Sequence, residues 1–224
     1  ASHPLAVSPQ WLPVLLAAET HVPPTNHRRL SVTTFTDFAA LRTAAEVYNV
    51  SPITAEDLHG PIGDWNVAAV DLMDKLFKDL SSFNADISNW DTSSVTSMVG
   101  MFQDCVAFNQ PVGFDTSKVS KVNRMFKGAT SFNQPVAFNT PMLDQMNQMF
   151  RFAAAFNQPL SFDISNILFE AHMSNMFQGT DALSDENKKL TVCAWQGNAV
   201  FDNLYGFNSS SGWPDCPSPS PPPP

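Results

Sequence analysis

Aromatic residues recur along the middle of the chain at a nearly constant interval. A Phe-Asn pair repeats at intervals of 25, 24 and 24 residues, beginning at Phe83, Phe108, Phe132 and Phe156. A second apolar pair keeps step with it, at Leu76-Phe77, Met101-Phe102, Met125-Phe126, Met149-Phe150 and Met176-Phe177. A period of about 20–29 residues is typical of repeat proteins, in which each unit buries its apolar face only against its neighbours. The pattern therefore predicts function on an extended surface rather than in a catalytic cleft.

Within one repeat the hydrophobic period changes from about 2 to about 3.6 residues. Val112 and Phe114 are separated by one small residue, which predicts a short half-buried strand. Helical spacing follows at Val119, Val122, Met125, Phe126 and Ala129. Between the two patterns, Asp115-Thr116-Ser117 supplies oxygens able to cap a helix N-terminus. One repeat is therefore expected to be a short strand, a capped turn and a short helix.

The predicted fold is an α/β repeat solenoid, a leucine-rich-repeat-like stack of short parallel strands and short helices. The Asn after each leading Phe would lie at one height and bond backbone groups freed at the bend. The predicted segments are an extended Pro-rich apolar arm at 1–31, a capping helix segment at 32–58, a solenoid of about five units at 59–182, a closing helix and loop at 183–216, and a Ser/Pro-rich tail at 217–224.

These motifs resemble the BspA-like leucine-rich repeat proteins, in the variant found in Mycoplasma lipoproteins. The clearest copy runs from Phe83-Asn84 through Trp90-Asp91-Thr92-Ser93 to Met101-Phe102, and the resemblance covers about Thr34 to Phe201. It implies a solenoid of the kind found on surface and secreted proteins, and it implies no catalytic residues. One unit departs from the pattern through three extra residues near Leu168, which predicts a local bulge.

Charge and motif content narrow the possible functions. The chain has 12 Lys and Arg residues against 21 Asp and Glu residues, a net charge of -9. That balance argues against nucleic acid or an anionic membrane as a partner, and no apolar run is long enough for membrane insertion. The five histidines lack ligand spacing, so no metal or other cofactor is expected. Helix capping explains the recurring aspartates Asp91, Asp115 and Asp163 better than calcium binding does.

The three cysteines predict one disulfide and one buried thiol. Cys105 occupies the position that holds Ala129 and Ala153 in other repeats, which favours a small core residue. A Cys193–Cys216 bridge would close the end of the stack, with a stabilisation of about 3 kcal/mol from loop entropy.

Two further signals favour an extracellular protein. The sequence contains two N-glycosylation sequons, at Asn49 and Asn208, both expected in loops. The tail resembles hydroxyproline-rich wall glycoproteins and is expected to form a polyproline II rod that carries O-glycans, through Pro217, Ser218, Pro219, Ser220, Pro221, Pro222, Pro223 and Pro224. The plainer alternative is a stiff linker to a further module.

Two segments are candidate contact surfaces. Three Gln-Pro dipeptides serve turn chemistry or, as the functional alternative, form a docking strip for another copy or a glycan: Gln110, Pro111, Gln134, Pro135, Gln158 and Pro159. The apolar part of the arm either covers its own stack or docks on a neighbour, through Trp11, Leu12, Val14, Leu15 and Leu16.

Together these features predict a non-enzymatic structural or adhesive glycoprotein that is extracellular, on the cell surface or in the cell wall. Its expected partners are other copies of itself, joined head to tail into a filament, or other extracellular proteins, with covalent glycans attached. The first alternative is a tethered glycan-binding module, which exposed aromatics in a groove would favour. The second is a carbohydrate-active enzyme, which two facing carboxylates in a deep pocket would favour.

Overall fold

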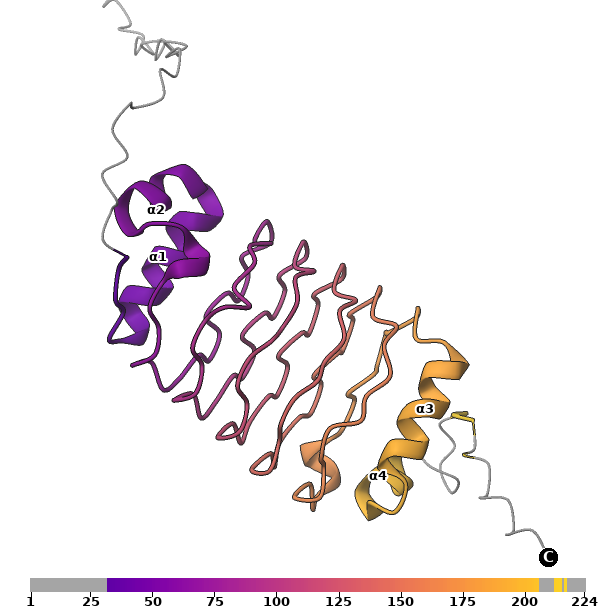
Figure 1. The fold of residues 1–224 in the computed structure, drawn as a ribbon. Coiled ribbons are helices and arrows are strands. Elements are labelled where there is room, and N and C mark those ends of the chain that lie inside the picture. The colour runs from indigo at the N-terminus through magenta and orange to yellow at the C-terminus, as the bar shows by residue number, and fades with distance from the viewer. Residues whose placement is uncertain (1–31, 206–211, 215, 217–224) are drawn as a thin grey trace, which may run out of the picture.

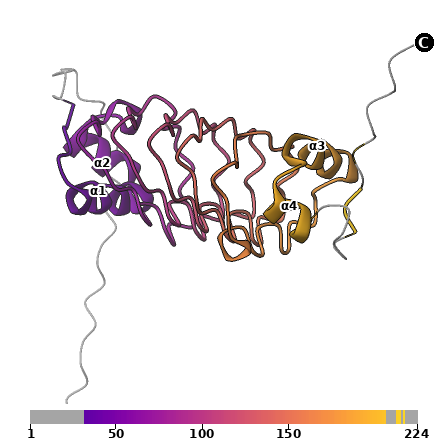
Figure 2. The ribbon, with the colours of Figure 1, turned by 90° about the horizontal axis from the view of Figure 1, so that it is seen from below.

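The computed structural model describes residues 32–205, 212–214 and 216. The predicted arm at residues 1–31, the sequon at Asn208 and the Ser/Pro tail at 217–224 lie outside the described residues. In the described part, a row of similar coils runs between two helical ends (Figure 1). Figure 2 shows the same stack from below, with one pair of helices at each end.

Two helices form the N-terminal end, α1 (Phe38–Val50) and α2 (Pro52–His59), followed by the 3₁₀ turn η1 (Ile62–Asp64). Asp37 caps α1 by accepting a hydrogen bond from the amide of Ala40, and Ser51 both ends α1 and caps α2. The helices bury only small or aliphatic side chains against the first coil, namely Leu41, Ala44, Ala45 and Ala55.

Two further helices form the C-terminal end, α3 (Asp185–Trp195) and α4 (Ala199–Leu204), with N-caps at Ser184 and Asn198. The three extra residues near Leu168 bulge outward and lead into the 3₁₀ turn η2 (Glu170–His172). Leu168 and Phe169 are 69% and 63% exposed there, so the bulge adds no core.

The structure contradicts the predicted α/β solenoid of parallel strands and helices. Within the described residues, all four α-helices lie in the two end segments and the coils contain none. The β-type pairing between neighbouring coils is limited to isolated parallel bridges, at Leu72–Ser97, Ser97–Lys121 and Lys121–Gln145, and further backbone hydrogen bonds join the turns of one coil to those of the next. The leucine-rich-repeat-like description is therefore wrong, and the coils are built from turns.

The segments predicted as helices are runs of consecutive turns at residues 74–79, 99–104, 123–128, 147–152 and 173–179, which define coils 1 to 5. Two residues four apart in each run have left-handed backbone, for example Arg124 (φ 58°) and Gly128 (φ 71°) in coil 3. An α-helix cannot contain such residues. The amides of Arg124 and Gly128 instead donate along the stack to the carbonyls of Asn147 and Arg151, at 3.0 and 2.8 Å.

The opposite side of each coil, predicted as a strand, is extended but makes no regular ladder. Val112 and Phe114 are 6% exposed and point inward, so the predicted alternation in burial is confirmed. The amide of Asn109 is bonded to the side chain of Asn84 in the preceding coil, rather than to a backbone carbonyl. Side-chain acceptors thus replace the backbone partners that a parallel sheet would supply.

Stacked phenylalanine rings fill the interior. The ring of the Met-Phe pair and the ring of the following Phe-Asn pair lie 4.0 Å apart in each of coils 1 to 4. Between coils, the centroids of equivalent rings are 5.3–6.1 Å apart in the first column and 5.9–6.1 Å apart in the second. Two continuous aromatic columns therefore run the length of the stack, close to the spacing that offset stacking favours.

We expect Phe126→Ala to lower the free energy of unfolding by about 3–5 kcal/mol, because its fully buried ring contacts Phe102, Phe132 and Phe150. The matched control is Phe169→Ala on the exposed bulge, which should change it by less than about 0.5 kcal/mol. Urea unfolding of both variants measures the difference, and similar losses would contradict the assignment of the core.

The turn geometry predicts unequal effects of one substitution at two glycines. Gly179 has φ 75°, and a Cβ added there would lie 2.5 Å from Cδ1 of Phe152 in the preceding coil. Gly179→Ala should therefore destabilise by more than about 1 kcal/mol. Gly113 has no left-handed φ and its nearest neighbouring atom would be 3.7 Å away, so Gly113→Ala should be neutral or stabilising by up to about 1 kcal/mol. Thermal unfolding that ranks the two variants in the reverse order would refute this account of the turns.

Candidate interaction surfaces

The asparagines of the Phe-Asn pairs form a continuous ladder of side-chain acceptors. The Oδ1 atom of each accepts from the amide of the equivalent Asn in the next coil, at 2.9 Å for Asn84, 2.9 Å for Asn109 and 2.8 Å for Asn133. At the last coil, Oδ1 of Asn157 accepts from the amide of Ser184 at 2.9 Å. The predicted structural role of this row is confirmed, although the bonds join different coils rather than closing a bend.

The Gln-Pro dipeptides lie beside this ladder and their amides take part in it. Nε2 of Gln110 donates to both O and Oδ1 of Asn84 at 3.2 Å, and Gln134 and Gln158 repeat the contact one coil further on. The three glutamines are partly buried, and the exposed members of the strip are Pro111, Pro135 and Pro159. Because the amides are bonded between coils, the surface that the strip offers to a partner is mainly proline rings.

The aspartates predicted to cap helices close local turns instead. Oδ1 of Asp91, Asp115 and Asp163 accepts from the amide of the serine two residues later at 2.8–3.0 Å. Hydrogen bonds from the side chain and amide of Ser117 hold the pKa of Asp115 below its ordinary value, and Ser93 does the same for Asp91. The stabilisation is therefore present above the ordinary pKa and is lost as the pH falls through the lowered one.

A row of buried threonines joins the coils at the same edge. The hydroxyl of Thr116 donates to the carbonyl of Asn139 at 2.8 Å, and Thr92 and Thr140 make the equivalent bonds. These three side chains are at most 3% exposed. The column of aspartates and threonines is thus occupied with structural bonds.

The first coil is closed by the side chain of one helical residue. Nη1 of Arg42 in α1 donates to the carbonyls of Lys75, Leu76 and Lys78, at 3.0, 2.8 and 3.1 Å. In the next coil, the carbonyls equivalent to those of Leu76 and Lys78 accept from amides of the preceding coil, as Met101 accepts from Phe77. The guanidinium therefore takes the place of a missing coil.

Helix α3 closes the last coil in a similar way. Nδ2 of Asn187 donates to O and Oδ1 of Asn157 at 2.8 Å, as a glutamine does in the coils before it. Oγ1 of Thr191 accepts from the amide of Leu160 at 3.0 Å, and Nε1 of Trp195 donates to the carbonyl of Phe162 at 2.7 Å. Both ends of the described stack are thus covered by helices.

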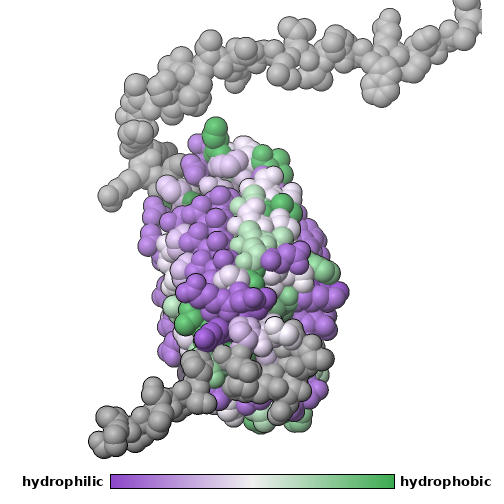
Figure 3. Space-filling view, turned by 90° about the vertical axis from the view of Figure 1, so that its right-hand side faces the viewer, coloured by the Kyte–Doolittle hydropathy of each residue, from purple (hydrophilic) through white to green (hydrophobic). Residues whose placement is uncertain are grey.

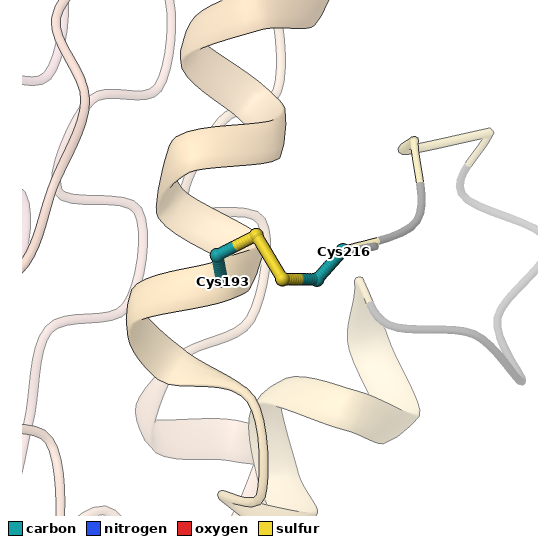
Figure 4. The surroundings of a disulfide bond; sticks show 2 residues. All are labelled: Cys193 and Cys216. Atoms are coloured by element: carbon teal, nitrogen blue, oxygen red, sulfur yellow. A yellow bond between two sulfur atoms is a disulfide. The ribbon is translucent and has the colours of Figure 1, made fainter. Parts of the chain in front are cut away.

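A disulfide between Cys193 and Cys216 ties the segment after α4 to the outer side of α3 (Figure 4), as the sequence predicts. The Cα atoms are 5.1 Å apart and Cys193 is exposed. Figure 3 faces this end of the molecule and shows mainly hydrophilic residues with smaller apolar patches. Cys105 is fully buried as predicted, and burial raises the pKa of its thiol to about 12, so it is not a reactive cysteine.

The sequon at Asn49 is not in a loop. Asn49 lies in the last turn of α1 and is partly buried, with Oδ1 enclosed and without a hydrogen-bond partner in the described structure. Its modification stays a prediction. Asn208 and the tail residues lie outside the described residues.

The hollows at the ends of the stack include two of about 510 and 560 Å³ that lack the features of the two alternative functions. One, of about 510 Å³, lies between the last coil and the α3–α4 junction, and its only carboxylate is Asp163. Its tryptophan, Trp195, is 3% exposed. The other, of about 560 Å³, lies against α1, and its only carboxylate is the helix cap Asp37. Neither of these two hollows pairs two acids or exposes a tryptophan. A smaller one, of about 280 Å³ beside α1, is lined by Asp74 and Asp79, which are bonded to Ser97 and Lys78.

Across the described ranges, His, Cys, Asp and Glu side chains do not gather in groups of three or more that could hold a metal ion. No helix within those ranges combines the length and the apolarity needed to cross a membrane.

A family model described as Mycoplasma protein of unknown function, DUF285, matches residues 46–161 and 113–213. The chain belongs to the DUF285 family. The matches cover the coils and the C-terminal helices, which agrees with the Mycoplasma type of repeat that the motifs resemble, and they end before the Ser/Pro tail. Comparison with curated proteins and with solved structures gives no match. Because the DUF285 description assigns no function, it provides no active-site or ligand residue.

Sequence reasoning missed the turn side of the coils because it assigned those residues to helices. A signal was present: Gly, Asn or Asp recurs at the left-handed positions, as Gly100, Asp104, Gly128, Asn175 and Gly179. These residue types favour positive φ. Residues between them, such as Lys127 and Arg151, are partly exposed on this side.

The asparagine ladder predicts that the side-chain oxygen Oδ1 of Asn133 contributes more to stability than its amide nitrogen does. Asn133→Ala removes the acceptor of the Asn157 amide and of Gln158 Nε2, and should cost about 1–3 kcal/mol because buried donors are left unsatisfied. Asn133→Asp keeps an acceptor at Oδ1 and should cost clearly less. Equal losses in urea unfolding of the two variants would show that the side-chain oxygen is not the stabilising atom.

Proposed function

We propose that this chain is a non-enzymatic extracellular module with a structural or adhesive role, whose coil stack contacts other proteins. The observation that carries the proposal is the disulfide on the outer side of α3. Cys193 is exposed there, and an exposed disulfide persists in an oxidising compartment but is reduced in the cytosol. The resemblance of the motifs to BspA-like surface proteins, the sequons and the Ser/Pro tail support the same compartment.

The carboxylates of the hollows support a binding role over glycoside hydrolysis. Each of the two larger hollows holds one, and Asp74 and Asp79 beside α1 are already bonded to Ser97 and Lys78. The coils offer a long surface instead, on which the same side-chain positions recur from coil to coil. Such extended surfaces are how stacked repeat proteins contact their partners.

The proposed partners are other copies of the chain, joined head to tail, or other extracellular proteins. In the described residues the ends of the stack are already bonded to Arg42 on one side and to Asn187, Thr191 and Trp195 on the other. A filament therefore needs a contact other than direct stacking of coils, and we assign that contact to the apolar arm, residues Trp11 to Leu16.

Peptide mass spectrometry of native material, alkylated without reduction, tests the compartment. We expect a linked Cys193–Cys216 peptide, together with glycans on Asn49, Asn208 or the tail. Free thiols at Cys193 and Cys216 in peptides with unmodified sequons and tail would contradict the extracellular assignment.

Analytical ultracentrifugation tests self-assembly. The full chain is expected to form species larger than a monomer, and a chain lacking residues 1–30 to remain monomeric with an unchanged circular dichroism spectrum. A monomeric full chain at the same concentration would exclude the filament and leave other extracellular proteins as the partners.

A further inference from the structure

Coils 3 and 4 place long side chains where the backbone favours small ones. Each turn run has two left-handed positions, which form two columns along the stack. The first column is Lys75, Gly100, Arg124, Gln148 and Asn175, and the second is Asp79, Asp104, Gly128, Phe152 and Gly179. Glycine, asparagine and aspartate adopt this conformation readily, whereas it strains other residues.

The fold itself does not require these strained residues, because other coils meet the same geometry with Gly100, Asn175 or Gly179. In coils 3 and 4, three of the four left-handed positions are Arg124, Gln148 and Phe152, with φ of 58°, 59° and 61°. Residues held in unfavourable backbone conformations gather at functional sites. The local concentration of strain therefore points to a use for these side chains.

The neighbouring column adds two cations at the same level. Lys127 and Arg151 are on adjacent coils, since the amide of Gly128 donates to the carbonyl of Arg151 at 2.8 Å. The equivalent residues elsewhere are Lys78, Gln103 and Gln178, so every member of this column carries hydrogen-bond donors. Nε of Arg124 lies 3.3 Å from Oε1 of Gln148 on the next coil.

These cations have no ion-pair partner among the described residues, although Nε of Arg124 donates to Oε1 of Gln148. The ion pairs among the described residues involve Arg42, Lys78 and Lys188, and none involves Arg124, Lys127 or Arg151. Nε of Arg151 is enclosed without a hydrogen-bond partner in the described structure, and its guanidinium lies 4.6 Å from the centre of the Phe152 ring. The nearby acid Asp104 accepts instead from Nε2 of Gln103 at 3.0 Å. In a chain of net charge -9, this leaves a local excess of unpaired positive charge.

We propose that this turn-side strip, formed by Arg124, Lys127, Gln148, Arg151 and Phe152, binds an acidic polysaccharide. Lys127 and Arg151 occupy the same position on adjacent coils and can contact successive carboxylate or sulfate groups through charge-assisted hydrogen bonds. Gln148 and the free donors of the strip suit sugar hydroxyls. Phe152 is 45% exposed and offers apolar ring surface to a sugar beside the part that the Arg151 guanidinium covers.

The open shape of the strip favours a polymer over a small anion, since neither of the end hollows includes any of the five residues. The inference deepens the proposed function by naming a class of partner, and it rests on that function only for the compartment in which such polymers occur.

Isothermal titration calorimetry of the purified full chain tests the strip with three polymers. Alginate carries carboxylates, dextran sulfate carries sulfates, and dextran is neutral. We expect binding to at least one acidic polymer, weakened by added salt, and none to dextran. Alginate and dextran sulfate distinguish a carboxylate ligand from a sulfate ligand. Equal binding of neutral dextran, or tighter binding of a DNA duplex, would overturn the proposal.

The decisive variant is K127Q/R151Q, which gives coils 3 and 4 the glutamine that coils 2 and 5 carry at the same position, Gln103 and Gln178. We expect affinity for the acidic polymer to fall about tenfold or more, with Tm within about 2 °C of the parent. The control K189Q removes an exposed cation from α3 and should leave affinity unchanged. Unchanged binding by K127Q/R151Q would overturn the proposal.

Strain provides a second, independent readout through Arg124→Asn, which introduces the residue of coil 5 at this position, Asn175. We expect weaker binding together with a Tm that is unchanged or about 2–4 °C higher, because asparagine tolerates the left-handed backbone. Unaltered affinity in this variant would remove Arg124 from the strip.

A chain that binds no acidic polymer overturns the strip but leaves the extracellular assignment intact, because mass spectrometry of the native disulfide and glycans tests that separately.

Discussion

Hydrogen bonding from coil to coil is the constraint on which the rest of this structure depends. A coil built from turns cannot satisfy its backbone internally as a helix does. On the turn side, backbone amides donate to carbonyls of the next coil, as Phe102 donates to Met125 at 2.9 Å. On the extended side and at the edge, the partners are side chains at fixed heights. Asparagine oxygens accept the amides on the extended side, and threonine hydroxyls donate at the edge. The regular repeat follows, because each acceptor must meet the same donor one coil later. The phenylalanine columns then add apolar burial in the same register.

The same constraint explains the two ends. The end of such a stack can be closed by any side chain that places a hydrogen-bond donor or acceptor where the next coil would have placed one. Arg42 supplies donors to the first coil, and Asn187 reproduces the contact that Gln158 makes in the last one. The disulfide from α3 to Cys216 then restrains the segment that follows this closing helix. The ends are capped, so the sides of the coils are the surface left for recognition.

The burial pattern of the repeat was predictable from the sequence, whereas its backbone was not. Val119, Val122, Met125, Phe126 and Ala129 are all buried as their spacing predicts, yet none of them lies in a helix. Inward-facing residues of consecutive tight turns recur at three and four positions, as those of a helix do, so periodicity alone cannot separate the two. Glycine at position 128, together with aspartate at the equivalent position 104, was the better guide, because both tolerate positive φ.

Some features of the candidate surfaces were likewise predictable from the sequence, and others were not. The disulfide followed from cysteine position and its loop, and the buried role of Cys105 followed from its place in the repeat. The turn-side strip was missed for a different reason. Its positions within a repeat are three and four residues apart and would share one face of a helix as well. The predicted helix therefore gave no sign that the backbone strains Arg124, Gln148 and Phe152.

Amide hydrogen exchange measured by NMR tests the side-chain ladder most directly. The amides of Asn109, Asn133 and Asn157 should be protected, because each donates to an asparagine oxygen in the preceding coil. Those of Val112 and Phe114, which no ladder partner holds in the described structure, should exchange faster despite their buried side chains. Equal protection of Val112, Phe114 and the three asparagines would indicate a regular parallel sheet and contradict this account.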